Sequence, residues 1–160
     1  MNPNSIKYKS PGTSSITRFE RIHTVIFDNK KSGELLVAKE IKKIIEKNNK
    51  KSKKTVLGLA TGSSPKGIYK LLIDFHKNEN LSFKNVITFI LDEYYGLEKD
   101  HTQSYHKFMD DNLFNHIDID VKNINIPHGK IDKKSIDNHC KDYEKKIKSC
   151  GGIDLSLIHI

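Results

Sequence analysis

The sequence predicts an α/β fold in which an open parallel sheet carries helices on both faces, and two observations lead to this prediction. Short, unbroken apolar runs alternate along the chain with longer segments in which apolar residues recur every three or four positions. Unbroken apolar runs are typical of strands buried on both faces, and the longer segments are typical of amphipathic helices. Strands that alternate with helices favour a parallel sheet.

The predicted elements follow one another without an internal repeat. Strands are expected over residues 55–60, 86–91, 123–126 and 153–157. Helices are expected from about residue 32 to the polar run 48–54, after Pro65, over 102–117 and over 133–150. Residues 1–18 have no apolar period and predict a disordered tail, so 19–160 forms the single domain. The chain ends inside its last predicted strand, so we expect a domain that is incomplete at its C-terminus.

Composition favours no nucleic-acid or membrane partner. The formal net charge is +8, but almost all basic residues are lysine, and only Arg18 and Arg21 are arginine. Bidentate recognition of phosphates and bases favours arginine, so the charge alone is weak evidence for a nucleic-acid site. The chain shows neither a membrane-spanning apolar run nor a signal-peptide pattern, which predicts a cytoplasmic protein. Cys140 and Cys150 match no disulfide or zinc pattern, and Cys140 is expected to be a buried free thiol.

A first candidate site follows the predicted strand 55–60. Thr61, Gly62, Ser63 and Ser64 combine a glycine and three hydroxyls at the expected start of a helix, where Ser64 suits the N-cap and Pro65 the first helical position. Free backbone N–H groups and the helix dipole attract anions there. The glycine spacing fits neither a Walker loop nor a dinucleotide fingerprint. The alternative is a capped turn that binds no ligand.

A second candidate site follows the predicted strand 86–91. Asp92 and Glu93 stand where the strand ends, and carboxylates partly removed from water have raised pKa values that suit a general base. The alternative is a solvated loop in which one carboxylate caps a nearby N–H. The aromatic pair Tyr94-Tyr95 could form a wall of a sugar site, although such pairs are more often core residues.

No metal site is predicted. The histidines lack the spacing to acidic or cysteine partners that metal ligands show, and we expect them to be surface or packed residues: His101, His106, His116 and His128.

Taken together, several ordered segments resemble the glucosamine-6-phosphate deaminase family, also described as glucosamine/galactosamine-6-phosphate isomerases. The segments are 57–65, 82–97, 101–119, 123–127 and 143–155. The resemblance implies a Rossmann-like fold of the sugar-phosphate isomerase type. It also implies conversion of glucosamine 6-phosphate and water to fructose 6-phosphate and ammonia, without a cofactor, in an enzyme that is often a homo-oligomer.

The resemblance assigns roles to both candidate sites. Asp92 matches the carboxylate that moves a proton between C2 and C1 of the open sugar, and Glu93 is its companion in the motif. Thr61 and Gly62, with the hydroxyls of Ser63 and Ser64, match the loop that holds the substrate phosphate. Many relatives have Gly-Thr in place of Ser63-Ser64, so a hydroxyl is kept at the second position.

The chain departs from the family pattern after residue 157. The family continues with a glycine-rich turn and a segment rich in Asp, Gly, His and Asn-Glu-Pro, which supplies the histidine that opens the sugar ring. Here the chain reads Ile158-His159-Ile160, so His159 does not match that histidine and receives no role. We therefore expect the 160-residue chain alone to be inactive and poorly soluble.

Three other functions stay open at this point. A 6-phosphogluconolactonase would share the phosphate loop and the acidic strand end. A sugar-phosphate sensor could keep the pocket and lose the chemistry, although it would not need Asp92. A basic nucleic-acid-binding module would bind DNA in a salt-dependent way, which the scarcity of arginine disfavours.

Overall fold

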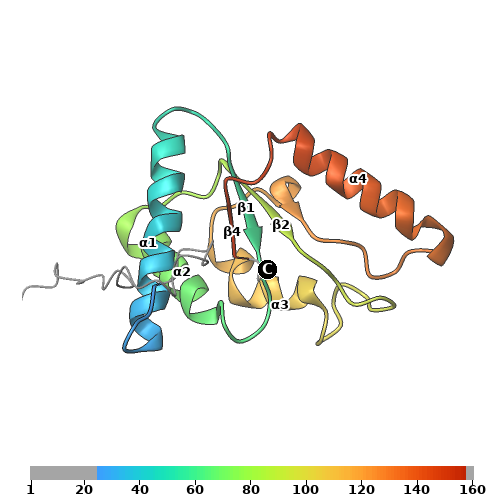
Figure 1. Cartoon of the computed structure of the whole chain (residues 1–160), viewed down its shortest axis with the longest axis horizontal. Helices are drawn as coiled ribbons and strands as arrows, with labels where there is room; N and C mark the ends of the chain where they lie inside the picture. The colour runs from blue at the N-terminus through green and yellow to red at the C-terminus, as the bar shows by residue number, and fades with distance from the viewer. Residues whose placement is uncertain (1–24, 158–160) are drawn as a thin grey trace, which may run out of the picture.

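The structure is a computed structural model that describes residues 25–157, so the predicted tail 1–18 lies outside the described residues. One parallel sheet has the order β3-β2-β1-β4. Its strands are β1 (Thr55–Leu59), β2 (Val86–Ile90), β3 (Ile124–Asn125) and β4 (Leu155–Ser156). The helices are α1 (Lys30–Asn49), α2 (Lys66–Glu79), α3 (Tyr105–Asn112) and α4 (Ile136–Ser149). The predicted parallel sheet with helices on both faces is confirmed, and Figure 1 shows α1 and α2 on the opposite side of the sheet from α4.

The central pair of strands sets the geometry of the molecule. Every residue of β1 and β2 is buried, which explains why both strands read as unbroken apolar runs. The two strands pair in parallel from Thr55 opposite Val86 to Leu59 opposite Ile90. Because they run in the same direction and end together, the loops that follow them leave from the same edge of the sheet.

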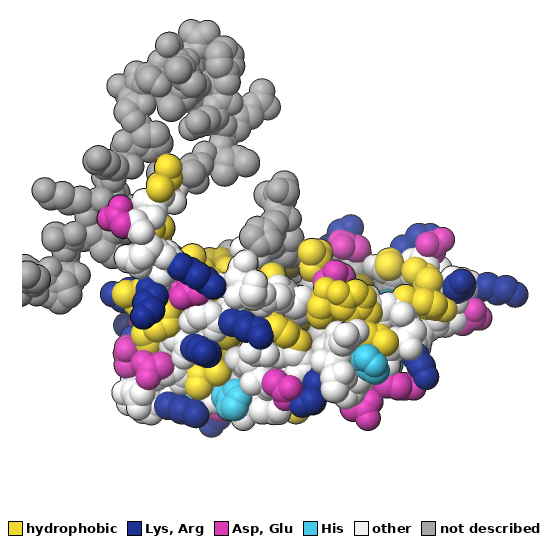
Figure 2. Space-filling model, turned by 90° about the horizontal axis from the view of Figure 1, so that it is seen from below, with side chains coloured by type: hydrophobic (Ala, Val, Ile, Leu, Met, Phe, Trp, Pro, Cys, Tyr) yellow, Lys and Arg dark blue, Asp and Glu magenta, His cyan; other side chains and the backbone are white. Residues whose placement is uncertain are grey.

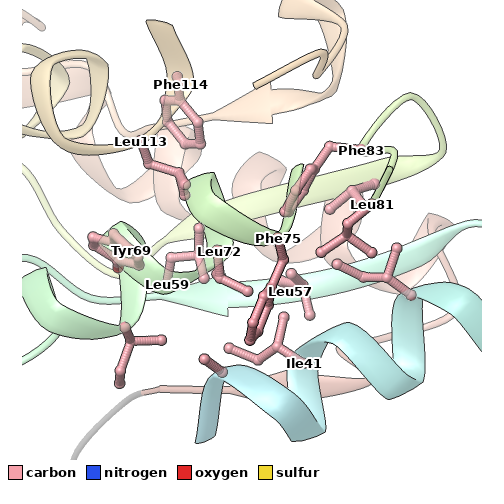
Figure 3. Packing of buried hydrophobic residues seen from close by; sticks show 14 of the residues in the cluster. Ile41, Leu57, Leu59, Tyr69, Leu72, Phe75, Leu81, Phe83, Leu113 and Phe114 are labelled. Atoms are coloured by element: carbon pink, nitrogen blue, oxygen red, sulfur yellow. The ribbon is translucent and has the colours of Figure 1, made fainter. Parts of the chain in front are cut away.

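The two faces of the sheet are covered unequally. On one face, α1, α2 and α3 form the larger core, in which Leu57 and Leu59 of β1 lie against Ile41 of α1 and Leu72 of α2 (Figure 3). On the other face, α4 alone covers a small cluster of Val56, Ile87 and Phe89. Since α4 has no fully buried residue, its hold on the sheet depends on a few half-buried side chains.

The prediction that Cys140 is a buried thiol can be compared with the side chains that pack against the sheet. Tyr143 and Ile147 of α4, and Cys150 directly after the helix, pack against the sheet, and the Tyr143 ring stands edge-on to Phe89 with centroids 5.5 Å apart. Cys140 is exposed, so the prediction of a buried thiol there is wrong. The contact with the sheet stops at Tyr143, and Cys140 lies beyond it toward the N-terminal end of the helix.

Several predicted elements are shorter in the structure. The predicted helix over 102–117 divides into α3 and a 3-10 helix at Phe114–His116, because Leu113 leaves the helical region with φ −149° and ψ −60°. The helix predicted over 133–150 begins with a 3-10 turn, Lys133–Ser135. The strands predicted at 123–126 and 153–157 shrink to the two residues of β3 and the two of β4. Among the helices of residues 25–157, none has the length and apolar character needed to cross a membrane.

The larger core makes a direct prediction about stability. Leu72 is fully buried between α2 and the sheet, so Leu72→Ala should leave a cavity and lower the free energy of unfolding by about 2–5 kcal/mol. Val121→Ala is the matched control, because Val121 is 80% exposed and its truncation should change stability by less than about 0.5 kcal/mol. Urea denaturation followed by circular dichroism measures both values, and equal losses in the two variants would contradict this description of the core.

Candidate functional site

Both candidate loops leave the sheet at the carboxyl ends of β1 and β2. This is the edge at which open parallel sheets bind their ligands. Figure 2 views the molecule from below, the side on which β1 ends in Figure 1, and shows charged side chains of both signs interspersed with hydrophobic ones. Three large apolar side chains of the loop after β2 are exposed: Leu91, Tyr94 and Tyr95.

The loop after β1 presents an open group of hydroxyls. Gly62 has φ +97°, a left-handed conformation that glycine adopts without strain, and Gly62, Ser63 and Ser64 are all exposed. Within residues 25–157, the hydroxyls of Ser63 and Ser64 have no hydrogen-bond partner. The loop therefore places unused donors directly before the start of α2, which is the arrangement that an anion requires.

The start of α2 differs from the prediction by one position. The helix begins at Lys66, Pro65 takes the N-cap position, and no side chain caps the helix, so Ser64 is not the cap. Pro65 has no N–H and a fixed φ, and it enters the helical region before the hydrogen-bonded turn begins. The Ser64 hydroxyl is consequently left available to a ligand.

The two carboxylates of the second loop differ sharply. Asp92 is exposed, whereas the Glu93 side chain keeps only 2% of its surface accessible. Glu93 accepts hydrogen bonds from the backbone N–H groups of Tyr94 at 2.9 Å, Tyr105 at 2.8 Å and His106 at 3.0 Å, and from His106 Nδ1 at 2.9 Å. The buried carboxylate therefore satisfies the first N–H groups of α3, where negative charge is also favoured by the helix dipole.

The pKa values of the pair are displaced in opposite directions. Protein atoms around the Asp92 carboxyl remove part of its hydration and, together with the charge of Glu93, raise the pKa of Asp92. Burial also acts to raise the pKa of Glu93, but the hydrogen bonds from Tyr105, His106 and Tyr94 outweigh burial and lower it. Of the two carboxyls, Asp92 therefore takes up a proton at the higher pH, and Glu93 is the one held in its ionised form.

Tyr105 joins the two candidate loops. A hydrogen bond with Tyr94 raises the pKa of the Tyr105 phenol, as do burial and the charge of Asp92, while a hydrogen bond with Thr61 acts in the opposite direction. The rings of Tyr94 and Tyr105 pack with their centroids 4.8 Å apart. Two motifs that lie far apart in the sequence therefore meet at the first residue of α3.

A third loop, after β3, supports the second one. Gly96 has φ +89° and donates its N–H to Gly129 O at 2.8 Å. A Cβ added to Gly129 would lie 2.6 Å from Leu97 O and 2.7 Å from Tyr94 O, so only glycine permits this approach. The sequence analysis missed Gly129, because nothing local signals a contact with a loop so distant in the chain.

Two tyrosines, one buried on α2 and one half-buried on α4, hold the ends of the strands. The Tyr69 hydroxyl of α2 donates to Ala60 O, directly before the hydroxyl loop. The Tyr143 hydroxyl of α4 lies 2.8 Å from Ile90 O and 2.9 Å from Asn125 O, at the last residues of β2 and β3. Burial raises the pKa of both phenols, so both remain protonated donors. Each candidate loop therefore begins at a carbonyl that a helix holds in place.

The sequence and the fold of this chain resemble those of known proteins. Residues 29–159 match the family described as glucosamine-6-phosphate isomerases/6-phosphogluconolactonase. The chain belongs to this family.

Curated relatives are about half identical to this chain over the segments that match. A glucosamine-6-phosphate deaminase of Clostridium botulinum (strain Loch Maree / Type A3) is 55% identical over 106 residues, which cover 66% of this chain and 43% of the relative. One from Fusobacterium nucleatum is 50% identical over 133 residues, covering 83% of this chain and 48% of the relative. The chain thus spans about half the length of the curated relatives it matches.

Solved structures agree with the family assignment. A monomeric glucosamine-6-phosphate deaminase superimposes with a TM-score of 0.74 at 38% identity, over 80% of this chain and 51% of that one. A 6-phosphogluconolactonase from Thermotoga maritima has a TM-score of 0.63 at 24% identity, over 77% of this chain and 53% of that one, and shows the shared fold alone.

A cavity of about 470 Å³ in this family member reaches the loop after β2 at Lys99 and does not include the candidate site residues. It opens at the β3 edge of the sheet, between α3 and α4, and is lined by His106, Ile124, Tyr143 and others, but by none of residues 61–64 or 92. Gly62, Ser63, Ser64 and Asp92 of the candidate site are all exposed at the strand ends. In the part of the chain that the structure describes, no three His, Cys, Asp or Glu side chains could hold a metal ion together.

Glu93 should make the folded protein sensitive to acid. Its pKa lies below the ordinary 4.5, so this group stabilises the folded state fully above about pH 4.5, and the contribution is lost as the pH falls through the folded pKa. Glu93→Gln should lower the free energy of unfolding at pH 7 by about 1.5–3 kcal/mol and flatten its decline below pH 5. Chemical denaturation between pH 3 and 7 measures this, with exposed Asp111→Asn as the control; the same acid slope in Glu93→Gln and wild type would refute the assignment.

Tyr143 should stabilise the folded protein more than its position on a lightly packed helix suggests. Tyr143→Phe keeps the ring and removes the donor shared by Ile90 O and Asn125 O, which should cost about 1–3 kcal/mol and speed amide exchange at Leu91 and Asp92. Tyr95→Phe is the matched control, because Tyr95 is 55% exposed and should be close to neutral. Chemical denaturation and hydrogen-exchange NMR measure both variants. Unchanged amide exchange at Leu91 and Asp92 in Tyr143→Phe would argue against the idea that the Tyr143 hydroxyl holds the end of β2 in place.

Proposed function

We propose that this chain supplies the phosphate loop and the proton-transferring carboxyl of a glucosamine-6-phosphate deaminase, which converts glucosamine 6-phosphate and water to fructose 6-phosphate and ammonia. One observation carries the proposal. An exposed carboxyl with a raised pKa, Asp92, stands beside an open hydroxyl loop at the start of α2, with Tyr105 between them. The identity with curated glucosamine-6-phosphate deaminases supports it.

The phosphate of the substrate would bind to the first loop. The hydroxyls of Ser63 and Ser64 have no partner in the described chain, and α2 starts directly behind them with no side-chain cap. A phosphate would accept hydrogen bonds from these hydroxyls and from the free N–H groups of the first helical turn. Thr61 and Gly62 would shape the loop, with Thr61 also bonded to Tyr105.

Asp92 would move the proton. In the open-chain substrate it takes the proton from C2 and delivers one to C1 through an enol, which leaves an imine at C2. Water then adds to C2, the C–N bond breaks, and the ketone of fructose 6-phosphate and ammonia are released. A raised pKa favours this task in a carboxyl, and partial loss of hydration and the neighbouring Glu93 charge raise the pKa of Asp92. Glu93 would not exchange the proton, because its oxygens are already bonded to four donors.

The other half of the reaction would come from outside the matched segment. The relatives extend to about twice the matched length, and we expect their additional half to supply the group that opens the sugar ring. Residues 25–157 alone are therefore expected to bind the sugar phosphate without turning it over. A homo-oligomeric full-length protein stays a prediction, since the deaminase of similar structure is described as monomeric.

A chimera tests the function directly. Residues 1–157 would be joined to the part of the Fusobacterium nucleatum deaminase that lies beyond its matched segment. The chimera should release ammonia from glucosamine 6-phosphate. Asp92→Asn should lower kcat by about 10²- to 10⁴-fold, the usual contribution of a general acid–base group. Ammonia is measured with a coupled assay.

The controls separate the alternatives. Asp111→Asn changes an exposed carboxylate on α3 and should leave kcat unchanged, whereas Ser64→Ala should raise KM more than it lowers kcat. The same chimera is assayed for hydrolysis of 6-phosphogluconolactone, since the family includes that activity. Lactone hydrolysis without ammonia release, or ammonia release that survives Asp92→Asn, would overturn the proposal.

A further inference from the structure

We propose that His106 is a positioning residue that divides the roles of the two carboxylates. It holds Glu93 as a buried, fixed anion, and so leaves Asp92 as the only carboxyl of the pair that exchanges a proton. The catalytic meaning of this division rests on the proposed function. The geometric content concerns the described chain alone and can be measured without catalysis.

The bond from His106 is the replaceable part of the Glu93 network. Three of the four donors are backbone N–H groups, of Tyr94, Tyr105 and His106, which almost any residue at these positions would supply. The fourth is His106 Nδ1, 2.9 Å from Glu93 Oε2, and within residues 25–157 it is the only side-chain donor to this carboxylate. A change of residue 106 therefore alters the environment of Glu93 without altering the backbone bonds.

The bond is one that an uncharged histidine can make. It requires a proton on Nδ1, and one neutral tautomer of the imidazole ring carries it there. This property distinguishes a histidine at this position from a lysine, whose ammonium would always place a positive charge against the pair.

The other surroundings of His106 are solvated and mixed in charge. The side chain keeps 16% of its surface exposed and lines the cavity at the β3 edge. The charged or titratable groups that line the same cavity come from α3, the loop after β2 and α4: Asp110, Lys99, His139, Asp142, Tyr143 and Lys146. Both signs of charge are therefore present along the cavity, and the ion pair given for His106 is the one with Glu93.

The consequence for Asp92 follows from the coupling of adjacent carboxyls. Two neighbouring carboxyls that are both free to protonate share one proton and titrate as a pair. Here Glu93 is held ionised by its donors, so its charge acts on Asp92 throughout the range in which Asp92 titrates. Loss of the His106 bond should raise the pKa of Glu93 toward that of Asp92 and bring the two titrations together.

Carboxyl NMR on the 160-residue chain tests the proposal. The chain is labelled with ¹³C at the Asp and Glu carboxyls, and the two signals are assigned with Asp92→Asn and Glu93→Gln. In His106→Ala the midpoint of Glu93 should rise by about one pH unit, which corresponds to the loss of one hydrogen bond to a charged group. His106→Asn should stay close to wild type, because the asparagine Nδ2 can donate from nearly the same place as Nδ1.

A matched control separates positioning from simple fraying of α3. Ser104 caps the same helix by accepting from Lys107 N at 3.0 Å, and it makes no hydrogen bond to Glu93. Ser104→Ala should therefore weaken α3 and leave the Glu93 midpoint where it is. Equal midpoint shifts in Ser104→Ala and His106→Ala, no shift in His106→Ala, or an asparagine variant that behaves like alanine would each overturn the proposal.

The carboxyl titration tests the positioning role of His106, and the chimera assay tests the deaminase function, so either proposal can be wrong without the other. An inactive chimera combined with the expected rise of the Glu93 midpoint would remove the deaminase function and keep the positioning role. An active chimera in which changes of residue 106 leave the Asp92 and Glu93 midpoints unaltered would keep the deaminase function and remove the positioning role of His106. In an active chimera, His106→Ala should lower kcat more than it changes KM, and His106→Asn should restore it, since neither variant touches the phosphate loop.

Discussion

The in-register parallel pairing of β1 with β2 is the constraint on which the rest of this structure depends. Every residue of both strands is buried, so each must be covered on both faces, and α1, α2 and α3 cover one face while α4 covers the other. Because Leu59 pairs with Ile90, the two strands finish together. The hydroxyl loop and the carboxylate loop are neighbours for this reason, although about thirty residues of chain separate them in the sequence.

Hydrogen bonds then determine the chemistry of the loops. Asp92 and Glu93 have the same functional group and are adjacent in the chain, yet one is exposed and the other is buried among four donors. Loss of hydration acts to raise the pKa of both carboxyls, and the donors from Tyr94 and from the start of α3 reverse this effect on Glu93. The position of a helix terminus thus decides which carboxylate can carry a proton.

Contacts between distant elements keep this arrangement in place. Tyr69 and Tyr143 donate to the last carbonyls of the strands, and Gly129 fits closely under the loop after β2. Tyr143 combines this task with the attachment of α4, whose packing against the sheet is light. Substitutions on α4 that move Tyr143 should therefore also disturb the carboxylate loop, although that loop follows β2 and is not part of the helix.

The sequence by itself determined the α/β class, the order of the elements, the parallel sheet and the family, because apolar periodicity and ordered motifs are local properties that the chain carries wherever it folds. It also identified the loops that contain Thr61, Gly62, Ser63 and Ser64, and Asp92 and Glu93. Only the tertiary structure decided that Cys140 is exposed, that Ser64 is not a cap, that Glu93 is buried, and that His106 and Gly129 contact its loop. Burial and hydrogen-bond partners depend on which elements meet in space, and no pattern within one segment records the donors that another segment brings to it.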